Sequence, residues 1–229
     1  MKHERFLLEM ILCFLTFFLP GYLAQGFGPV AGPVSASVMI QSIVLGIPQF
    51  LLLVYIASLS RETPMESWGF TRFGATDALR VILVLIGCFA IFTPFAVLVM
   101  ALPSSAGKYM ASGFRWKLAG PSQIPLAVAF GLVAGYREEF FFRSYMLHRM
   151  DQLGAPAALS VIISTVLFSA GHLYQGPLGV ATSTALGVLF AGVYLRRGNL
   201  HVIAIAHGLY NASVLCLSLL RTSPLPTSG

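Results

Sequence analysis

The sequence has little charge for its length. Of its 229 residues, only 10% are Asp, Glu, Lys or Arg, whereas 57% are hydrophobic. A soluble domain carries about 25% charged and about 45–50% apolar residues, so this chain has too little charge to cover a water-facing surface of its size. The composition excludes an ordinary cytosolic enzyme, a disordered chain and a nucleic-acid-binding module. It predicts an integral membrane protein.

Cysteine is also scarce. Cys13, Cys88 and Cys216 each lie inside an apolar stretch, and the sequence contains no CxxC pair. An odd number without metal-ligand spacing argues against a disulfide framework and against a cysteine-based zinc site. The sequence also lacks the GxSxG, Walker, HExxH and GxGxxG motifs.

Long hydrophobic runs are abundant. A helix needs about 20 largely apolar residues to cross about 30 Å of hydrocarbon. This length predicts an all-α fold, a polytopic transmembrane helical bundle of about seven spans, with six to eight as the range that short or kinked runs allow. The predicted spans are residues 6–24, 36–59, 80–102, 123–149, 155–174, 178–195 and 200–220. The first could instead be a signal peptide, but its length, its Glu9 and the lack of a clear small-x-small site favour a retained helix.

The net charge of +6 is interpreted as a topology signal, because Lys and Arg gather in cytoplasmic loops. An N-terminus inside places more basic residues on the cytoplasmic side than on the other. This orientation, in the cytoplasmic (inner) membrane, is therefore the one we expect. The cytoplasmic set is Lys2, Arg5, Arg61, Arg72, Arg80, Arg149, Arg196 and Arg197, against Lys108, Arg115, Lys117 and Arg221. The loop from Arg61 to Arg80 also carries Trp68 and is predicted to be interfacial, with a substrate-contacting loop as the alternative.

Ionisable residues interrupt three of the last four spans. One charge at mid-membrane costs about 2.5–3.5 kcal/mol, so four unpaired charges on one helix cost on the order of 10 kcal/mol, comparable with the stability of a whole domain. These side chains must be paired, hydrated or functional. They are Arg137, Glu138, Glu139 and Arg143 in the fourth span, His172 at the end of the fifth, and His207 with Asn211 in the seventh.

Helical spacing separates the two carboxylates. Glu139 and Arg143 are four residues apart on one face, which favours a neutralising ion pair over a direct chemical role. Glu138 points about 100° away from Glu139. It follows Gly131-xxx-Gly135, a spacing that allows close approach of a neighbouring backbone. Glu138 is therefore predicted to face the bundle interior as the freer carboxylate.

Four polar residues are estimated to lie at similar depths in the membrane. Counted at 1.5 Å per residue from the nearest cytoplasmic turn, Glu138 lies about 18 Å and His172 about 24 Å into the membrane. His207 and Asn211 lie about 12 and 17 Å in, on one helical face. Helix tilt can absorb the difference. We expect all four to converge near mid-membrane.

In this order, Glu138-Glu139-xxx-Arg143, Phe168-xxx-His172 and His207-xxx-Asn211 resemble the CAAX prenyl protease and bacteriocin-processing (CPBP, or Abi) family of intramembrane proteases. The resemblance covers about residues 120–215. It implies an endopeptidase that hydrolyses a peptide bond in or beside the membrane. Glu138 and His172 would activate the water, His207 and Asn211 would donate to the tetrahedral intermediate, and Glu139 with Arg143 would support them. With this catalytic core in residues 120–221, the hydrophobic runs predict membrane spans and an interfacial loop in 1–119, and the Ser/Pro-rich end predicts a flexible tail in 222–229.

The cofactor stays open in this interpretation. The family is often described as metalloproteases, and one Glu with two His forms the ligand set of some catalytic zinc sites. Glu138, His172 and His207 would then be the candidate ligands. Asn211, one turn beyond His207, fits an oxyanion donor better than a residue that supports a metal. We favour no obligatory metal, with zinc as the alternative.

The implied partners are the lipid bilayer and a peptide or membrane-protein substrate, with or without an attached lipid, and no nucleic acid. Two other functions compete with proteolysis. A proton-coupled transporter would have two similar halves, whereas the polar residues here lie only in the second half. A catalytically idle scaffold or immunity protein has no need for costly buried charges.

Overall fold

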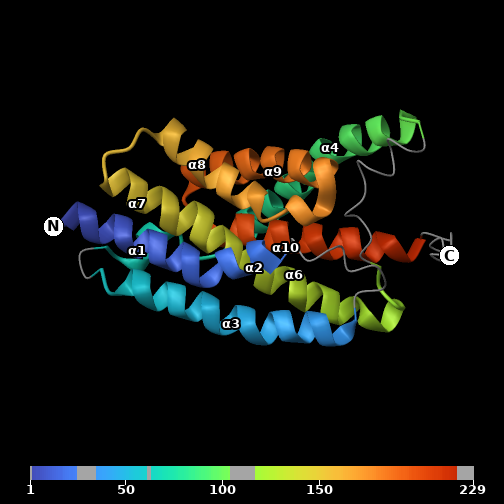
Figure 1. Ribbon diagram of the computed structural model, residues 1–229, viewed down its shortest axis with the longest axis horizontal. Coiled ribbons are helices and arrows are strands. Elements are labelled where there is room, and N and C mark those ends of the chain that lie inside the picture. Colours follow the sequence, from blue (N-terminus) through green and yellow to red (C-terminus); the bar gives the residue numbers. More distant parts are fainter. Residues whose placement is uncertain (1, 25–34, 61–62, 104–116, 221–229) are drawn as a thin grey trace.

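The computed structural model describes residues 2–24, 35–60, 63–103 and 117–220; the predicted tail, 222–229, lies outside them. This part of the chain is an all-α bundle, as predicted (Figure 1). The α-helices are α1 (Lys2–Phe17), α2 (Leu19–Ala24), α3 (Ala36–Ser58), α4 (Ala75–Ala101), α6 (Ile124–Glu139), α7 (Met146–Gln152), α8 (Ala157–Ala170), α9 (Gly176–Arg197) and α10 (Leu200–Leu217). Short 3-10 turns lie at Met65–Trp68, Pro121–Gln123, Leu173–Gln175 and Ser218–Leu220, and a π-helix at Phe140–Tyr145.

Each predicted span falls on a helix of the bundle. Within the described residues, five helical stretches are long and apolar enough to cross a membrane. The two other predicted spans do not meet this criterion of length and apolar composition, each for a physical reason. The fourth is the continuous rod of α6, the π-helix and α7, which carries the buried charges. The fifth is α8, whose 14 residues measure only about 21 Å.

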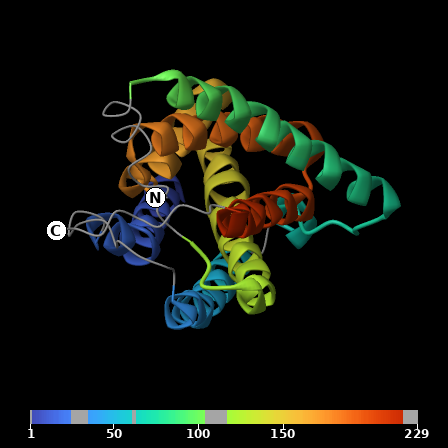
Figure 2. The same ribbon diagram turned by 90° about the vertical axis from the view of Figure 1, so that its right-hand side faces the viewer.

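Glycine lets α6 and α10 pack backbone against backbone. A Cβ atom added to Gly131 would lie 2.4 Å from the carbonyl oxygen of Gly208, and one added to Gly135 would lie 2.4 Å from that of Ala204. These distances are too short for any side chain, so the close approach predicted from the Gly-xxx-Gly spacing is present. Viewed along the bundle, α6 and α10 lie at its centre with α3, α4, α8 and α9 around them (Figure 2). This contact brings the end of α6 beside the middle of α10.

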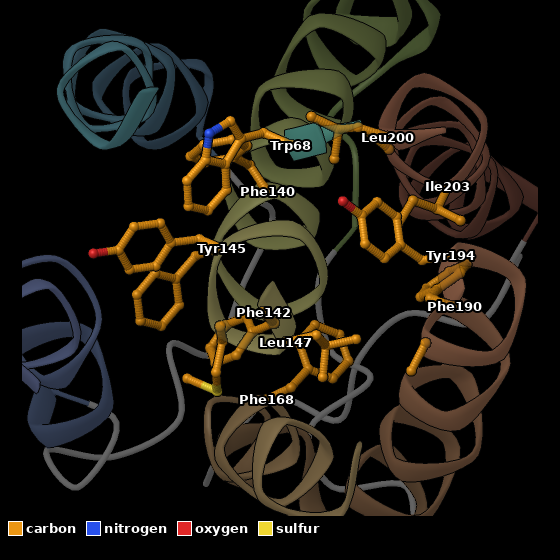
Figure 3. Packing of buried hydrophobic residues seen from close by; sticks show 14 of the residues in the cluster. Trp68, Phe140, Phe142, Tyr145, Leu147, Phe168, Phe190, Tyr194, Leu200 and Ile203 are labelled. Atoms are coloured by element: carbon orange, nitrogen blue, oxygen red, sulfur yellow. The ribbon is translucent and has the colours of Figure 1, made fainter. Parts of the chain in front are cut away.

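The end of the bundle that holds the N-terminus is closed by aromatic packing. Trp68 is completely buried, and its ring stacks on Tyr145 at 5.6 Å between centroids (Figure 3). Its carbonyl accepts a hydrogen bond from Ser144 Oγ, and the amide of Leu200 donates to the carbonyl of Gly69 at 3.0 Å. Gly69 has φ +84°, a conformation that glycine adopts readily. The interfacial prediction is therefore wrong for Trp68, because its ring fills the core instead.

An ion pair attaches the first helix to the same end. Glu9 Oε1 lies 2.6 Å from Arg149 Nη2, and Arg149 is fully buried. The same Arg149 nitrogen donates to Ser60 Oγ at 2.8 Å, and the Tyr145 hydroxyl donates to Glu9. Glu9, the residue that distinguishes this run from a signal peptide, is thus the counter-ion of a buried arginine.

The turn between α8 and α9 stops short of the end of the bundle. The start of α6 and the end of α10 lie at the end away from the N-terminus, and both extend further in that direction than the α8–α9 turn (Figure 1). His172 lies in this turn, two residues beyond the end of α8. Because α8 is short, His172 lies at the level of the bundle interior. A helix long enough to span the membrane would place it near the end of the bundle instead.

Candidate active site

A cavity of about 150 Å³ lies between α6, the α8–α9 turn, α9 and α10. On the side towards the start of α6 and the end of α10 its wall is mostly apolar and includes Phe130, Val214 and Leu215, with the hydroxyl residue Ser218 beside them. Its inner wall is polar. The four residues expected to converge all line this cavity: Glu138, His172, His207 and Asn211.

Glu139 joins two elements of the site through one carboxylate oxygen. Its Oε1 accepts from Arg143 Nη1 at 3.1 Å, the ion pair that the spacing predicted, and from His207 Nδ1 at 2.7 Å. Glu139 and Arg143 are fully buried. A carboxylate that is paired with Arg143 only accepts, so His207 is the donor, and in the neutral form of the His207 ring Nε2 is then an acceptor. Sequence spacing gave no sign of this contact, because it joins two different helices.

Aromatic rings surround the guanidinium group of Arg143. Its central carbon lies 4.1 Å from the ring centroid of Phe168 and 5.8 Å from those of Phe142 and Phe190. Gly187 makes room for it, since a Cβ there would lie 3.1 Å from Nη2. Nη2 has no hydrogen-bond partner within the described residues. Cation–π attraction therefore stabilises the side of the guanidinium that the Glu139 carboxylate does not reach.

The two carboxylate oxygens of Glu138 face different neighbours, Arg137 and His207. Oε1 lies 3.2 Å from Arg137 Nη2, and Arg137 also donates from Nη1 to Gln49 Oε1 at 3.1 Å. Oε2 lies 3.9 Å from His207 Nε2 and has no hydrogen-bond partner among the residues that the structure describes. Oε2 of Glu139 also lacks a partner there, but Glu138 accepts one side-chain hydrogen bond and Glu139 accepts two, so Glu138 is the freer of the two. The pairing of Glu138 with Arg137 was not foreseen.

The charges of the site balance without a contribution from histidine. Two carboxylates, of Glu138 and Glu139, are matched by the guanidinium groups of Arg137 and Arg143. A neutral His207 keeps this part of the bundle neutral, which lowers the cost of burying it away from water.

His172 presents the same kind of nitrogen as His207. Its Nδ1 donates to the carbonyl oxygen of Phe168 at 2.9 Å, because a carbonyl can only accept. Nε2 of the neutral ring is therefore an acceptor too. Glu138 lines the same cavity as both rings. Two imidazole acceptors and one carboxylate consequently surround the inner cavity.

This donor set has the chemistry of metal ligands but not their arrangement. Acceptor Nε2 atoms held by hydrogen bonds at Nδ1 are typical of zinc-binding histidines. Within the described part of the chain, however, no three His, Cys, Asp or Glu side chains are placed to hold a metal ion together. Glu138, His172 and His207 therefore do not form a preorganised zinc site.

Sequence reasoning missed part of the cavity wall. Tyr174, Gln175 and Thr182 also line it. Nothing in their local sequence distinguishes them, because hydroxyl and amide side chains are common where transmembrane helices meet. Tyr22 of α2 was also missed. It donates to the carbonyl of Leu167 at 2.8 Å and lies against the α8–α9 turn.

A model of the family described as type II CAAX prenyl endopeptidase, Rce1-like, matches residues 120–213. The match confirms the resemblance on the segment that carries all three motifs. At the level of the family it supports a CAAX-type intramembrane protease. No curated protein and no solved structure matches the chain significantly.

Proposed function

We propose that this integral membrane protein, whose residues 120–213 match the type II CAAX prenyl endopeptidase family, hydrolyses a peptide bond in or beside the bilayer with a water activated by Glu138. One observation carries the proposal. Glu138 lines a cavity that two histidines share, and its carboxylate oxygen Oε2 is buried with no hydrogen-bond partner among the described residues.

The nucleophilic water is assigned to the space between Glu138 and His207. The 3.9 Å between Oε2 and Nε2 is too long for a direct hydrogen bond, but one water can bridge it. Both atoms are acceptors, so each takes one hydrogen of that water. The family motif assigns the water to His172 as well; because a water has only two hydrogens, Nε2 of His172 is the alternative to Nε2 of His207 as the second acceptor. Arg137 holds Oε1 of Glu138, which leaves Oε2 as the oxygen that reacts.

The reaction follows from these assignments. Glu138 takes a proton from the water while the water oxygen forms a bond to the carbonyl carbon, and the C=O electron pair moves to oxygen. The amide of Asn211 donates to this oxyanion, a stabilisation that is strong in a low-dielectric cavity. Glu138 then returns the proton to the amide nitrogen as the C–N bond breaks. The products are a carboxylic acid and an amine.

The role of His207 differs from the one that the resemblance implies. A neutral His207 donates its only N–H to Glu139 and has none left for an oxyanion. We therefore assign it to the water, and assign the oxyanion to Asn211.

The membrane setting is part of the proposal. The chain lies in the cytoplasmic membrane with its N-terminus inside, an orientation supported by the distribution of Lys and Arg. Its substrate is a peptide or membrane protein, with or without an attached lipid.

The test needs no assumed substrate. New peptide termini are compared between membranes that contain the wild type and membranes that contain Glu138→Gln at matched abundance. Glu66→Gln, a change at an exposed carboxylate outside the cavity, is the control. Termini present with the wild type and the control, and absent with Glu138→Gln, are expected. If folded wild type yields none under any growth condition, proteolysis is rejected in favour of a scaffold or a proton relay.

A further inference from the structure

Thr182 of α9 lines the cavity and carries a buried hydroxyl to which the proposed reaction gives no role. Its exposed fraction is 3%, and its Oγ1 has no hydrogen-bond partner within the described residues. Serine and threonine inside helices usually donate to a carbonyl of the preceding turn. Ser183 and Thr184 beside it do so, both to Val180, at 3.0 and 2.8 Å. Thr182 therefore keeps a donor that its own helix does not use.

The proposed reaction assigns only one donor to the oxyanion. The N–H groups of His172 and His207 are held by Phe168 and Glu139. Ser218, another hydroxyl of the cavity wall, donates to the carbonyl of Leu215. Oxyanions in acyl transfer are commonly held by more than one donor, whereas the assignments above supply only the amide of Asn211.

We propose that Thr182 is a catalytic residue that donates a hydrogen bond from Oγ1 to the scissile carbonyl oxygen, which it shares with Asn211 as that oxygen becomes an oxyanion. This inference rests on the proposed protease function. This role would explain why the Thr182 hydroxyl is buried without a hydrogen-bond partner among the described residues. Burying an unpaired hydroxyl is costly, and a bound peptide would supply the missing acceptor.

The chain offers a matched control. Thr165 of α8 is 4% exposed, and its Oγ1 also has no hydrogen-bond partner among the described residues. Thr165 does not line the cavity. Thr182→Val and Thr165→Val thus make the same isosteric change at two equally buried sites, only one of which can meet substrate.

The experiment uses the purified full chain and a synthetic peptide that spans a cleavage site found with the wild type. Thr182→Val is expected to lower kcat about a hundredfold, the loss typical of an oxyanion donor, with KM within about twofold. Thr182→Ala should show the same loss, and Thr182→Ser should restore most of the rate. Thr165→Val should keep kcat within about threefold. Size-exclusion elution and the unfolding temperature verify folding.

The outcomes separate this inference from the proposed function. An active wild type with equal kcat in Thr182→Val, or with equal losses in both valine variants, overturns the role of Thr182 and leaves the protease intact. A rise in KM alone overturns it as well, because it shows ground-state binding. A wild type that cleaves nothing overturns both.

Discussion

The Nδ1 atom of His207 lies 2.7 Å from Oε1 of Glu139, although the two residues are 68 positions apart. This hydrogen bond fixes the orientation of the ring and directs Nε2 towards Glu138. Two consecutive carboxylates thus act differently: Glu139 is a positioning residue that also neutralises Arg143, and Glu138 is the proposed base.

Replacing each carboxylate by its amide should separate these roles. Glu139→Gln leaves Arg143 fully buried without a counter-ion, and we expect a loss of about 3–5 kcal/mol in the free energy of unfolding. Glu138→Gln removes the partner of Arg137, which is 25% exposed and also donates to Gln49, so we expect a smaller loss of stability than for Glu139→Gln, together with a complete loss of cleavage. Thermal unfolding of the purified proteins in detergent measures the difference. Equal stability of the two variants would contradict the assignment.

A double replacement tests positioning apart from stability. Arg143→Met alone strands the Glu139 carboxylate and should reduce the yield of folded protein. Adding Glu139→Leu removes the stranded charge, and methionine packs well among the rings of Phe142, Phe168 and Phe190. The double variant should therefore recover most of the yield.

Activity should not return with the yield. In the double variant, His207 Nδ1 has lost its carboxylate acceptor, so the ring is no longer held in the required tautomer. We expect cleavage to remain at least about tenfold below wild type, the usual contribution of a hydrogen bond to a charged group. Wild-type cleavage by the double variant would show that Glu139 has no positioning role.

The contact between α6 and α10 makes a third prediction. Gly135→Ala would place Cβ 2.4 Å from the Ala204 carbonyl oxygen, and because backbone cannot yield as a side chain can, we expect at least about 1–3 kcal/mol of destabilisation. Gly192 of α9 has no atom within 4 Å of the equivalent position. Gly192→Ala should therefore be neutral or stabilise the protein by about 0.5–1 kcal/mol. Unfolding temperatures of the two variants give the comparison.

Much of this fold could be predicted because hydrophobic length is a local property. The helices fall where the apolar runs lie, and the pair of Glu139 with Arg143 follows from helical spacing alone. Trp68 shows the limit of such reasoning. An aromatic ring beside charges suggests an interface, but its burial depends on Tyr145 and Ser144, which lie some 75 residues further along the chain.

The site was predictable only in part, for a similar reason. Charges in apolar helices are visible in a sequence because they are costly, which is how Glu138 and His207 stand out. A threonine in an apolar helix is common, so Thr182 does not stand out in the sequence as a charge does. That its hydroxyl lacks a partner among the described residues and that the residue lines the cavity are visible only in the structure. The tautomer of His207 likewise depends on a contact between two helices.

The direction of the cavity makes the last prediction. It extends from Glu138 past Phe130 of α6 and Val214 of α10, towards the end where α6 begins and α10 ends, whereas Trp68 closes the other end. With the N-terminus inside, the cavity therefore lies on the side away from the cytoplasm. A single cysteine at Val214, with Cys13, Cys88 and Cys216 replaced, should react with a membrane-impermeant maleimide in right-side-out vesicles and not in inside-out ones. Ser67→Cys, an exposed position at the closed end, should show the reverse. If the two positions exchange sides, the proposed orientation is wrong but the direction of the cavity stands; if both react from one side, the cavity does not open as the packing of Trp68 implies.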